Sequence, residues 1–334
     1  MAWGLALFLA ASAGAAETVK VATFNCEFLV RSRVHIKYGL PFNLTGDAKN
    51  EWDQPGFRDA KFKEAADVVA AVVRRIDADV IALVEVGDEA DVEELRLAVK
   101  ALGLDYPHKA VCESADVTTG QHVAVLSKRP LTKVVKTIPG RESYLREPDD
   151  PDTEDDTGVS KGLHVVFEVG GRPVHLFVVH LASERGGHEQ DAQRIAQASI
   201  VRRNSLEPLN KGEHVIVAGD LNDHRGQPAL RRIRGLDDLW EDLIQTGGPV
   251  FNRPKAKETP TEYNARLREH WTYEFEGQRQ QIDHILISQS LKRACTRGRE
   301  VRIDISFIPV TEKIPGTDHP VSDHRAVMVT FEFQ

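Results

Sequence analysis

A short apolar segment of the chain ends in residues whose types suit metal or phosphate chemistry. Residues 215–218 form an apolar run typical of a buried strand that Gly219 ends, and Asp220 and Asn222 follow two residues apart. At the end of a strand this spacing lets both side chains reach the same rim of a pocket. A carboxylate and an amide there can hold a hard cation, a phosphate or an attacking water. The alternative is an ordinary turn, in which Asp and Asn bond only to local backbone.

The rest of the chain repeats this pattern where other apolar segments begin or end. The residues concerned are two imidazoles, four carboxylates and two amides: His180, His324, Glu85, Asp220, Asp283, Asp323, Asn25 and Asn222. Such a set suits the hydrolysis of phosphoesters. A divalent ion held by oxygen ligands would offset charge on the phosphate, and a histidine paired with a carboxylate would deprotonate water.

Hydrophobic periodicity indicates the elements that must position these side chains. Apolar runs predict strands at residues 19–24, 80–84, 123–126, 163–169, 174–180, 215–218, 282–287 and 326–331. Apolar residues at helical spacing predict an amphipathic helix over 65–76, and further helices are expected over 91–102 and 191–205. Residues 31–60, rich in Gly, Pro, Asn and Asp, and the acidic residues 147–157 are predicted to be loops. The order strand, helix, strand near the N-terminus indicates an α/β unit.

Composition and charge narrow the class of protein. The 334 residues, 41% of them hydrophobic, are enough for a substantial core. Because the chain shows no internal repeat and no linker, we expect a single domain over residues 17–334. The net charge of −8 argues against long-range attraction to nucleic acid or anionic lipid, although a bound metal or a local cationic site can override it.

The first 16 residues are apolar or small and carry no side-chain charge. This run is too short to span a bilayer and is typical of a secretory signal peptide, with cleavage after Ala15 or Ala16. No other apolar run is long enough for a membrane span. We therefore expect a secreted or periplasmic monomer. An odd number of cysteines allows at most one internal disulfide, among Cys26, Cys112 and Cys295.

Six short motifs contain the polar residues named above: Thr23-Phe-Asn25, Ala82-Leu-Val-Glu-Val86, Val179-His-Leu181, Gly219-Asp-Leu-Asn222, Gln281-Ile-Asp-His284 and Ser322-Asp-His324. Their order and spacing resemble the endonuclease/exonuclease/phosphatase superfamily, over about residues 19–331. That group includes pancreatic-type deoxyribonucleases, abasic-site endonucleases, bacterial sphingomyelinases and inositol-polyphosphate phosphatases. The resemblance implies an α/β fold of the α+β type. It would be a four-layer α/β/β/α sandwich of two packed, mixed, mostly antiparallel sheets flanked by helices, with the site at one end.

The resemblance also implies how metal and base are arranged. Glu85 would be the principal ligand of Mg²⁺, with Asn25 and Asp323 beside it, and Mn²⁺ or Ca²⁺ are further candidates. His324 would be the general base for water, and Asp283 would orient it as a carboxylate fixes an imidazole tautomer.

The remaining implied roles concern the phosphate. Asp220 and Asn222 would position the nucleophile or the phosphate, although in parts of the family the counterpart of Asp220 is argued to be the base. His180 would contact the scissile phosphate, either stabilising its charge or protonating the leaving oxygen. His284 should point to the opposite face of its strand from Asp283 and serve the structure. Thr272 either faces the site or packs in the core or at its rim. Three cations lie near the ends of the motifs and can bind phosphate oxygens, namely Lys161, Arg185 and Arg225.

Three functions are compatible with this set of residues. The first is an exported, metal-dependent nuclease or related phosphodiesterase. The second is a phosphatase or a sphingomyelinase-like phospholipase. Against a lipid substrate, the sequence shows no exposed aromatic or apolar hairpin that would insert in a membrane, and Trp52 and Phe57 are the only candidates. Against a nucleic-acid substrate, the chain is acidic overall and shows no basic groove. The third is a binding protein that keeps the fold without catalysis, which would have lost Glu85, Asp283 or His324; all three residues are present.

Overall fold

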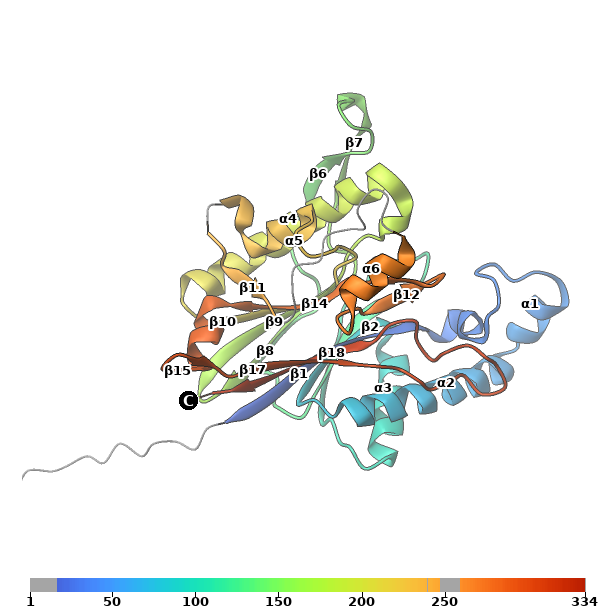
Figure 1. Ribbon diagram of the computed structural model, residues 1–334. Coiled ribbons are helices and arrows are strands. Elements are labelled where there is room, and N and C mark those ends of the chain that lie inside the picture. Colours follow the sequence, from blue (N-terminus) through green and yellow to red (C-terminus); the bar gives the residue numbers. More distant parts are fainter. Residues whose placement is uncertain (1–16, 239, 247–258, 334) are drawn as a thin grey trace, which may run out of the picture.

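Two six-stranded sheets form the centre of the computed structural model, which describes residues 17–238, 240–246 and 259–333 (Figure 1). The strands of the first sheet are, in spatial order, β17 (Ile303–Ile308), β18 (Ala326–Glu332), β1 (Thr18–Leu29), β2 (Val80–Val86), β4 (His122–Ser127) and β3 (His108–Val111). Those of the second are β11 (Leu243–Gln245), β14 (Asp283–Ser288), β10 (His214–Asp220), β9 (Arg172–His180), β8 (Gly162–Val169) and β5 (Lys133–Val135). In each sheet the central pair is parallel, β1 with β2 and β9 with β10, and the other pairings are antiparallel.

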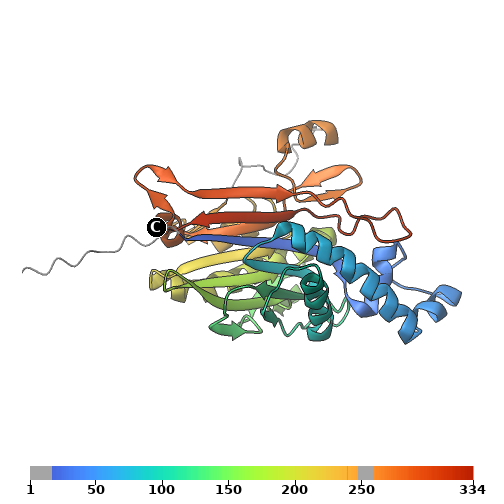
Figure 2. The ribbon, with the colours of Figure 1, turned by 90° about the horizontal axis from the view of Figure 1, so that it is seen from below.

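The apolar pattern of the strands explains why helices cover both sheets. Along β1, Val19 and Val21 face the second sheet, while Ala22 and Phe24 face the helices, so both faces are buried. Helices α2 (Pro55–Ile76) and α3 (Glu89–Ala101) cover the first sheet, and α4 (Gly187–Asn210) and α5 (Pro228–Arg234) cover the second. Figure 1 shows the two helical layers on opposite sides of the sheets, and Figure 2 shows α2 and α3 from below. The predicted four-layer sandwich is therefore confirmed.

The remaining elements are short and lie around these layers. Near the N-terminus are η1 (Arg31–Tyr38) and α1 (Gly46–Trp52), and the middle of the chain adds β6 (Glu142–Leu145), η2 (Pro151–Thr153), β7 (Glu154–Thr157), η3 (Glu184–Gly186) and η4 (Leu236–Asp238). The last third adds α6 (Pro260–Leu267), β12 (Tyr273–Phe275), β13 (Gln278–Gln280), α7 (Gln289–Ala294), β15 (Thr296–Arg297) and β16 (Glu300–Val301). The β6–β7 hairpin projects past α4 at the top of Figure 1.

Two segments predicted to be loops contain regular structure. Residues 31–60 form η1, α1 and the first turns of α2, because Trp52 packs between the rings of Tyr38 and Phe57. Trp52 is buried by these contacts, so it is not the exposed membrane-facing residue that the sequence suggested. The acidic segment 147–157 contains η2 and β7, and β7 pairs with β6. In both cases the order comes from specific contacts, ring packing in the first and strand pairing in the second, that composition does not reveal.

Three further predictions concern export and redox state. The predicted signal peptide, residues 1–16, lies outside the described residues. Within the described part of the chain, no helix combines the length and apolar character needed to cross a bilayer. The three cysteines are buried and unbridged, and burial raises the pKa of Cys26 and Cys295 to about 12 and that of Cys112 to about 11. The disulfide that the sequence allowed is therefore not formed.

The sheet topology brings distant parts of the chain to one end of the sandwich. The two central parallel pairs both end there. Because β14 runs antiparallel to β10, and β18 antiparallel to β1, both of these strands begin at that same end. Polar residues at the ends of four strands and at the starts of two others consequently meet in one place.

Candidate active site

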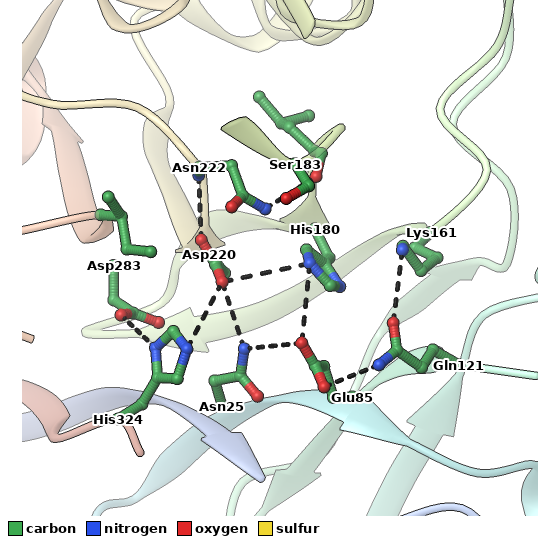
Figure 3. Close-up of polar contacts among 12 residues, drawn as sticks. Asn25, Glu85, Gln121, Lys161, His180, Ser183, Asp220, Asn222, Asp283 and His324 are labelled. Atoms are coloured by element: carbon green, nitrogen blue, oxygen red, sulfur yellow. Dashed lines mark hydrogen bonds and ion pairs between the residues drawn. The ribbon is translucent and has the colours of Figure 1, made fainter. Parts of the chain in front are cut away.

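Three of the predicted residues lie side by side on the second sheet. Asp220 at the end of β10 is in register with His180 at the end of β9 and with Asp283 at the start of β14. Residues directly opposite each other in a sheet project from the same face, so the three side chains form a row (Figure 3). The sequence suggested that Gly219 ends the strand, but β10 continues to Asp220, so Gly219 lies within it. Only glycine fits at this position, because a Cβ would come within 2.0 Å of the Val179 carbonyl oxygen.

His324 and Asp283 form the predicted histidine–carboxylate pair. Nδ1 of His324 is 2.7 Å from Oδ2 of Asp283, and Nε2 faces the pocket, 3.9 Å from Oδ2 of Asp220. The backbone N–H of Asp283 donates to Oγ1 of Thr272 at 3.1 Å, so Thr272 supports the pair and does not line the pocket. Because an ionised carboxylate only accepts hydrogen bonds, Nδ1 carries a proton and Nε2 is the nitrogen available to a reactant.

Burial and neighbouring charges act differently on the two histidines. Burial alone would lower the pKa of His324, but Asp283, Asp323 and Asp220 raise it well above its usual value. Burial lowers the pKa of His180 well below its usual value, and Lys161 and His324 add to this effect. The surroundings therefore shift the pKa values of the two histidines in opposite directions, upward for His324 and downward for His180.

Glu85 lies at the end of β2 in a strained backbone conformation. Its φ is 58°, in the left-handed region that non-glycine residues seldom adopt, and the register of β2 against β4 shifts at this residue. Its carboxylate accepts hydrogen bonds from the Phe28 backbone N–H at 3.1 Å, from Gln121 Nε2 at 2.6 Å and from Asn25 Nδ2 at 3.2 Å. Strain held in place by many contacts is typical of functional residues.

Two asparagines hold Asp220 in position. Asn25 Nδ2 donates to Oδ2 of Asp220 at 3.1 Å as well as to Glu85, while its own carbonyl oxygen accepts from the Glu27 backbone N–H at 2.9 Å. The Asn222 backbone N–H donates to Oδ1 of Asp220 at 2.9 Å, and its side chain donates to the Leu181 carbonyl. In this arrangement Asn25 presents its amide nitrogen to the carboxylates. A role as a metal ligand through its oxygen requires the amide to turn over.

The side chains that face the pocket fit a divalent cation. Glu85, His180 and Asp220 each offer a ligand atom, and these atoms lie within 4.8 Å of one another; the same holds for Asp220, Asp283 and His324. Glu27 is half-buried, and its enclosed Oε2 has no hydrogen-bond partner; the pKa of its carboxyl is raised to about 7, first by burial and then by Asp323. A buried group of carboxylates without a cation is unfavourable.

The sequence did not identify all of the residues around Glu85. Gln121 precedes β4, which pairs with β2, and links Glu85 to Lys161, whose Nζ lies 3.4 Å from Oε1 of Gln121 and 3.3 Å from Asp116 (Figure 3). Glu27 belongs to the bulge at the end of β1. A polar residue next to a predicted strand was the available signal for both. Neither position belongs to a motif whose spacing is diagnostic.

The other predicted polar residues have different surroundings. Asp323 is about one-third exposed, and its Oδ1 is 3.7 Å from Nε2 of His324. Arg185 lies over the ring of Phe275 and donates to the hydroxyl of Tyr273, whose own ring packs against His324. His284 is structural, as predicted: it is buried and contacts Gln245 and the Asp223 carbonyl. Burial lowers the pKa of Arg225, and the nearby Arg234 lowers it further.

The chain is similar in sequence and in fold to several known proteins. A putative neutral sphingomyelinase of Drosophila melanogaster is 26% identical over 258 residues, which cover 75% of this chain and 52% of that protein. The chain thus spans about half the length of that relative. The crystal structure of truncated Caenorhabditis elegans TDP2 is similar with a TM-score of 0.54 and 17% identity, covering 95% of this chain and 98% of that one.

A second solved structure is similar to the same degree. It is a mutant of beta toxin from Staphylococcus aureus with bound magnesium ions, which has a TM-score of 0.55 and 16% identity and covers 94% of this chain and 99% of that one. At these identities the two structures establish the fold alone. The family model described as "Endonuclease/Exonuclease/phosphatase family" matches residues 22–324, nearly the whole described chain. The chain therefore belongs to the endonuclease/exonuclease/phosphatase family, whose members hydrolyse phosphoesters with a divalent metal.

Proposed function

We propose that the protein is an exported, metal-dependent phosphodiesterase in which His324 and Asp283 activate water. The observation that carries this proposal is the geometry of the pair. Asp283 holds Nδ1 of His324 at 2.7 Å, and this leaves Nε2 directed at the pocket beside Asp220 and Glu85. A water bound there can pass a proton to Nε2, and Asp283 stabilises the imidazolium that forms.

Mg²⁺ is the cation we propose for this site, with Mn²⁺ and Ca²⁺ as other candidates. Glu85 is the principal ligand in the proposal, and Asp220 has a ligand atom within reach of it. Asn25 and Asp323 would complete the set, Asn25 after its amide turns over. A bound divalent ion supplies positive charge to the phosphate oxygens and lowers the pKa of nearby acids. Hard cations of this type prefer oxygen ligands, which this set provides.

The chain's own residues have distinct tasks in the proposed reaction. Asp220, held by both asparagines, positions the attacking water opposite the leaving oxygen. Because burial lowers the pKa of His180, we assign it a hydrogen bond to a phosphate oxygen rather than protonation of the leaving group. Asn222 fixes Asp220 through its backbone N–H. Lys161 supplies positive charge behind His180.

The balance of charge favours a phosphodiester over a phosphomonoester. The site gathers the acids Glu27, Glu85, Asp220, Asp283 and Asp323, with Lys37, Lys161 and His324 as the nearby cations. A phosphomonoester carries nearly two negative charges at neutral pH and a phosphodiester carries one. In such acidic surroundings, one divalent ion offsets the single negative charge of a phosphodiester more completely than the nearly two negative charges of a phosphomonoester.

Nucleic acid is the substrate that the sequence predicted, and a lipid phosphodiester is the second candidate. The lipid candidate is favoured by the similarity to a putative neutral sphingomyelinase and by Phe275. The ring of Phe275 is 48% exposed at the β12–β13 hairpin, and Tyr273 of the same hairpin packs against His324. An exposed aromatic ring next to the site can contact the apolar part of a lipid.

A substrate panel separates these candidates. The chain from residue 17 onward would be assayed on plasmid DNA, RNA, sphingomyelin vesicles and bis-(p-nitrophenyl) phosphate, each with and without chelator. Cleavage of DNA or RNA that chelator abolishes supports the nuclease. Turnover of sphingomyelin, reduced by Phe275→Ala while hydrolysis of the soluble diester is unchanged, supports the lipid candidate. Absence of turnover on every diester would contradict the proposal.

The raised pKa of Asp220 predicts that metal affinity depends on pH. Burial and the neighbouring Asp283 raise the pKa of Asp220 to about 8, so below that pH the carboxyl holds a proton that a metal must displace. Calorimetric titration with Mg²⁺ should therefore show proton release at pH 6 that declines towards pH 9, with affinity rising up to about tenfold per pH unit below 8. Asp220→Asn should release fewer protons at pH 6. Affinity independent of pH from 6 to 9 would show that Asp220 does not bind the metal.

A further inference from the structure

A fully buried lysine lies behind the pocket and has no part in the reaction described above. Lys37, in η1, is 1% exposed. Its Nζ donates to the carbonyl oxygens of Cys26 at 2.6 Å, Glu27 at 2.7 Å and Val321 at 2.6 Å. An ammonium group has three hydrogens to donate, and all three are used on backbone. Desolvating a lysine is costly, so a buried one with a complete set of acceptors calls for an explanation.

Two of these carbonyls belong to the bulge at the end of β1. Glu27 and Phe28 have φ angles of 45° and 50°, a strained conformation for residues with side chains. The bulge carries the Phe28 N–H that donates to Glu85 and the Glu27 N–H that donates to Asn25. By binding two carbonyls of the bulge, the ammonium fixes the donors that hold the proposed metal ligand Glu85.

The third carbonyl belongs to the segment that carries the proposed base. Val321 directly precedes Ser322, whose hydroxyl donates to the Asn25 carbonyl and accepts from the backbone N–H of His324. Lys37 and Val321 are 284 positions apart in the chain. A single ammonium thus connects the end of the first strand to the start of the last one, and with them the two halves of the site.

The charge of Lys37 also acts on the pocket. Burial lowers the pKa of Lys37, whereas the carboxylates of Glu27, Asp323 and Glu85 act in the opposite direction and favour the charged ammonium. Without a metal these acids repel one another, and a cation fixed behind them keeps them close together.

We propose that Lys37 is a positioning residue that sets Glu85 and His324 at their working separation and keeps the acidic pocket assembled for its metal. This inference rests on the proposed function, because it assigns metal binding to Glu85 and base catalysis to His324. Lys37 touches neither substrate nor reacting atoms. Its removal should therefore weaken metal binding and slow turnover while leaving the affinity for substrate nearly unchanged.

The test replaces the ammonium and measures metal binding, kcat and KM separately. In Lys37→Met we expect the Mg²⁺ concentration for half-maximal activity to rise about 10- to 100-fold, as for loss of other groups that orient metal ligands. We expect kcat at saturating Mg²⁺ to fall by a similar factor, with KM within about threefold of the parent's. Lys109→Met is the matched control: Lys109 pairs with Glu89 and Glu93 on the surface, and its loss should change none of these values.

A second variant decides the outcome if Lys37→Met does not fold. Lys37→Gln removes the charge but keeps two donors, and circular dichroism and thermal melting establish whether each variant is folded. A folded variant with the parent's Mg²⁺ dependence and kcat would overturn the inference. So would failure of both variants to fold, because Lys37 would then serve the fold rather than the site. Parent and His324→Ala, assayed in parallel, test the proposed function independently of Lys37.

Discussion

Replacing His324 by alanine is expected to lower kcat for phosphodiester hydrolysis by about 10³-fold, within the range typical for loss of a general base. The expectation follows from the position of Nε2, which faces the pocket while Asp283 holds Nδ1. Substrate binding should change little, so the loss should fall on kcat rather than on KM. Steady-state kinetics on a soluble diester at saturating Mg²⁺ measure both constants.

The His324 experiment needs a control for folding. His324 is 6% exposed, and its removal leaves the buried Asp283 carboxylate unpaired. We therefore expect a loss of about 1–3 kcal/mol in the free energy of unfolding, and assays belong well below the melting temperature. His188→Ala, at an exposed position outside the site, should match the parent. A folded His324→Ala variant with parental kcat would show that another group is the base.

Replacing Glu85 by glutamine is the second change with a large expected effect. Glutamine keeps the size of the side chain and an oxygen that can accept hydrogen bonds, but it removes the negative charge that attracts the cation. Loss of a group that merely orients a metal ligand costs about 10- to 100-fold in affinity, so loss of the principal ligand should cost more than about 100-fold. Activity titrated with Mg²⁺, and calorimetry with Mg²⁺ alone, measure this shift.

The Glu85 result is interpreted against a matched variant. Glu168→Gln makes the same substitution at an exposed position of β8, away from the pocket. It should bind Mg²⁺ as the parent does. If Glu85→Gln also has the parent's metal titration, Glu85 is not the ligand and its contacts with Gln121, Phe28 and Asn25 serve the structure alone.

The central strands could be predicted from the sequence because their burial is simple. Residues buried on both faces give continuous apolar runs, and the polar residues at the ends of those runs, such as Glu85 and Asp220, are costly to bury without a purpose. The two-sheet arrangement followed only from the resemblance to a family. Periodicity reports which residues are buried, and it does not report which sheet they belong to.

The details that the sequence missed depend on contacts between distant residues. The bulge at Glu27 and Phe28 is held by Lys37, and Lys37 lies in a segment predicted to be a loop. The same segment is ordered by the rings of Tyr38, Trp52 and Phe57. Side chains such as these have no local pattern, so their roles emerge only when the fold brings their partners together.

The most direct test of the central claim measures hydrolysis of bis-(p-nitrophenyl) phosphate by the chain from residue 17 onward. The protein would be treated with chelator and then titrated with Mg²⁺, beside His324→Ala under the same conditions. The proposed mechanism predicts no turnover in chelator, recovery with added Mg²⁺, and at most about one-thousandth of that recovery in His324→Ala. Turnover that persists in chelator, or equal recovery in the folded His324→Ala variant, would contradict metal-dependent hydrolysis with His324 as the base.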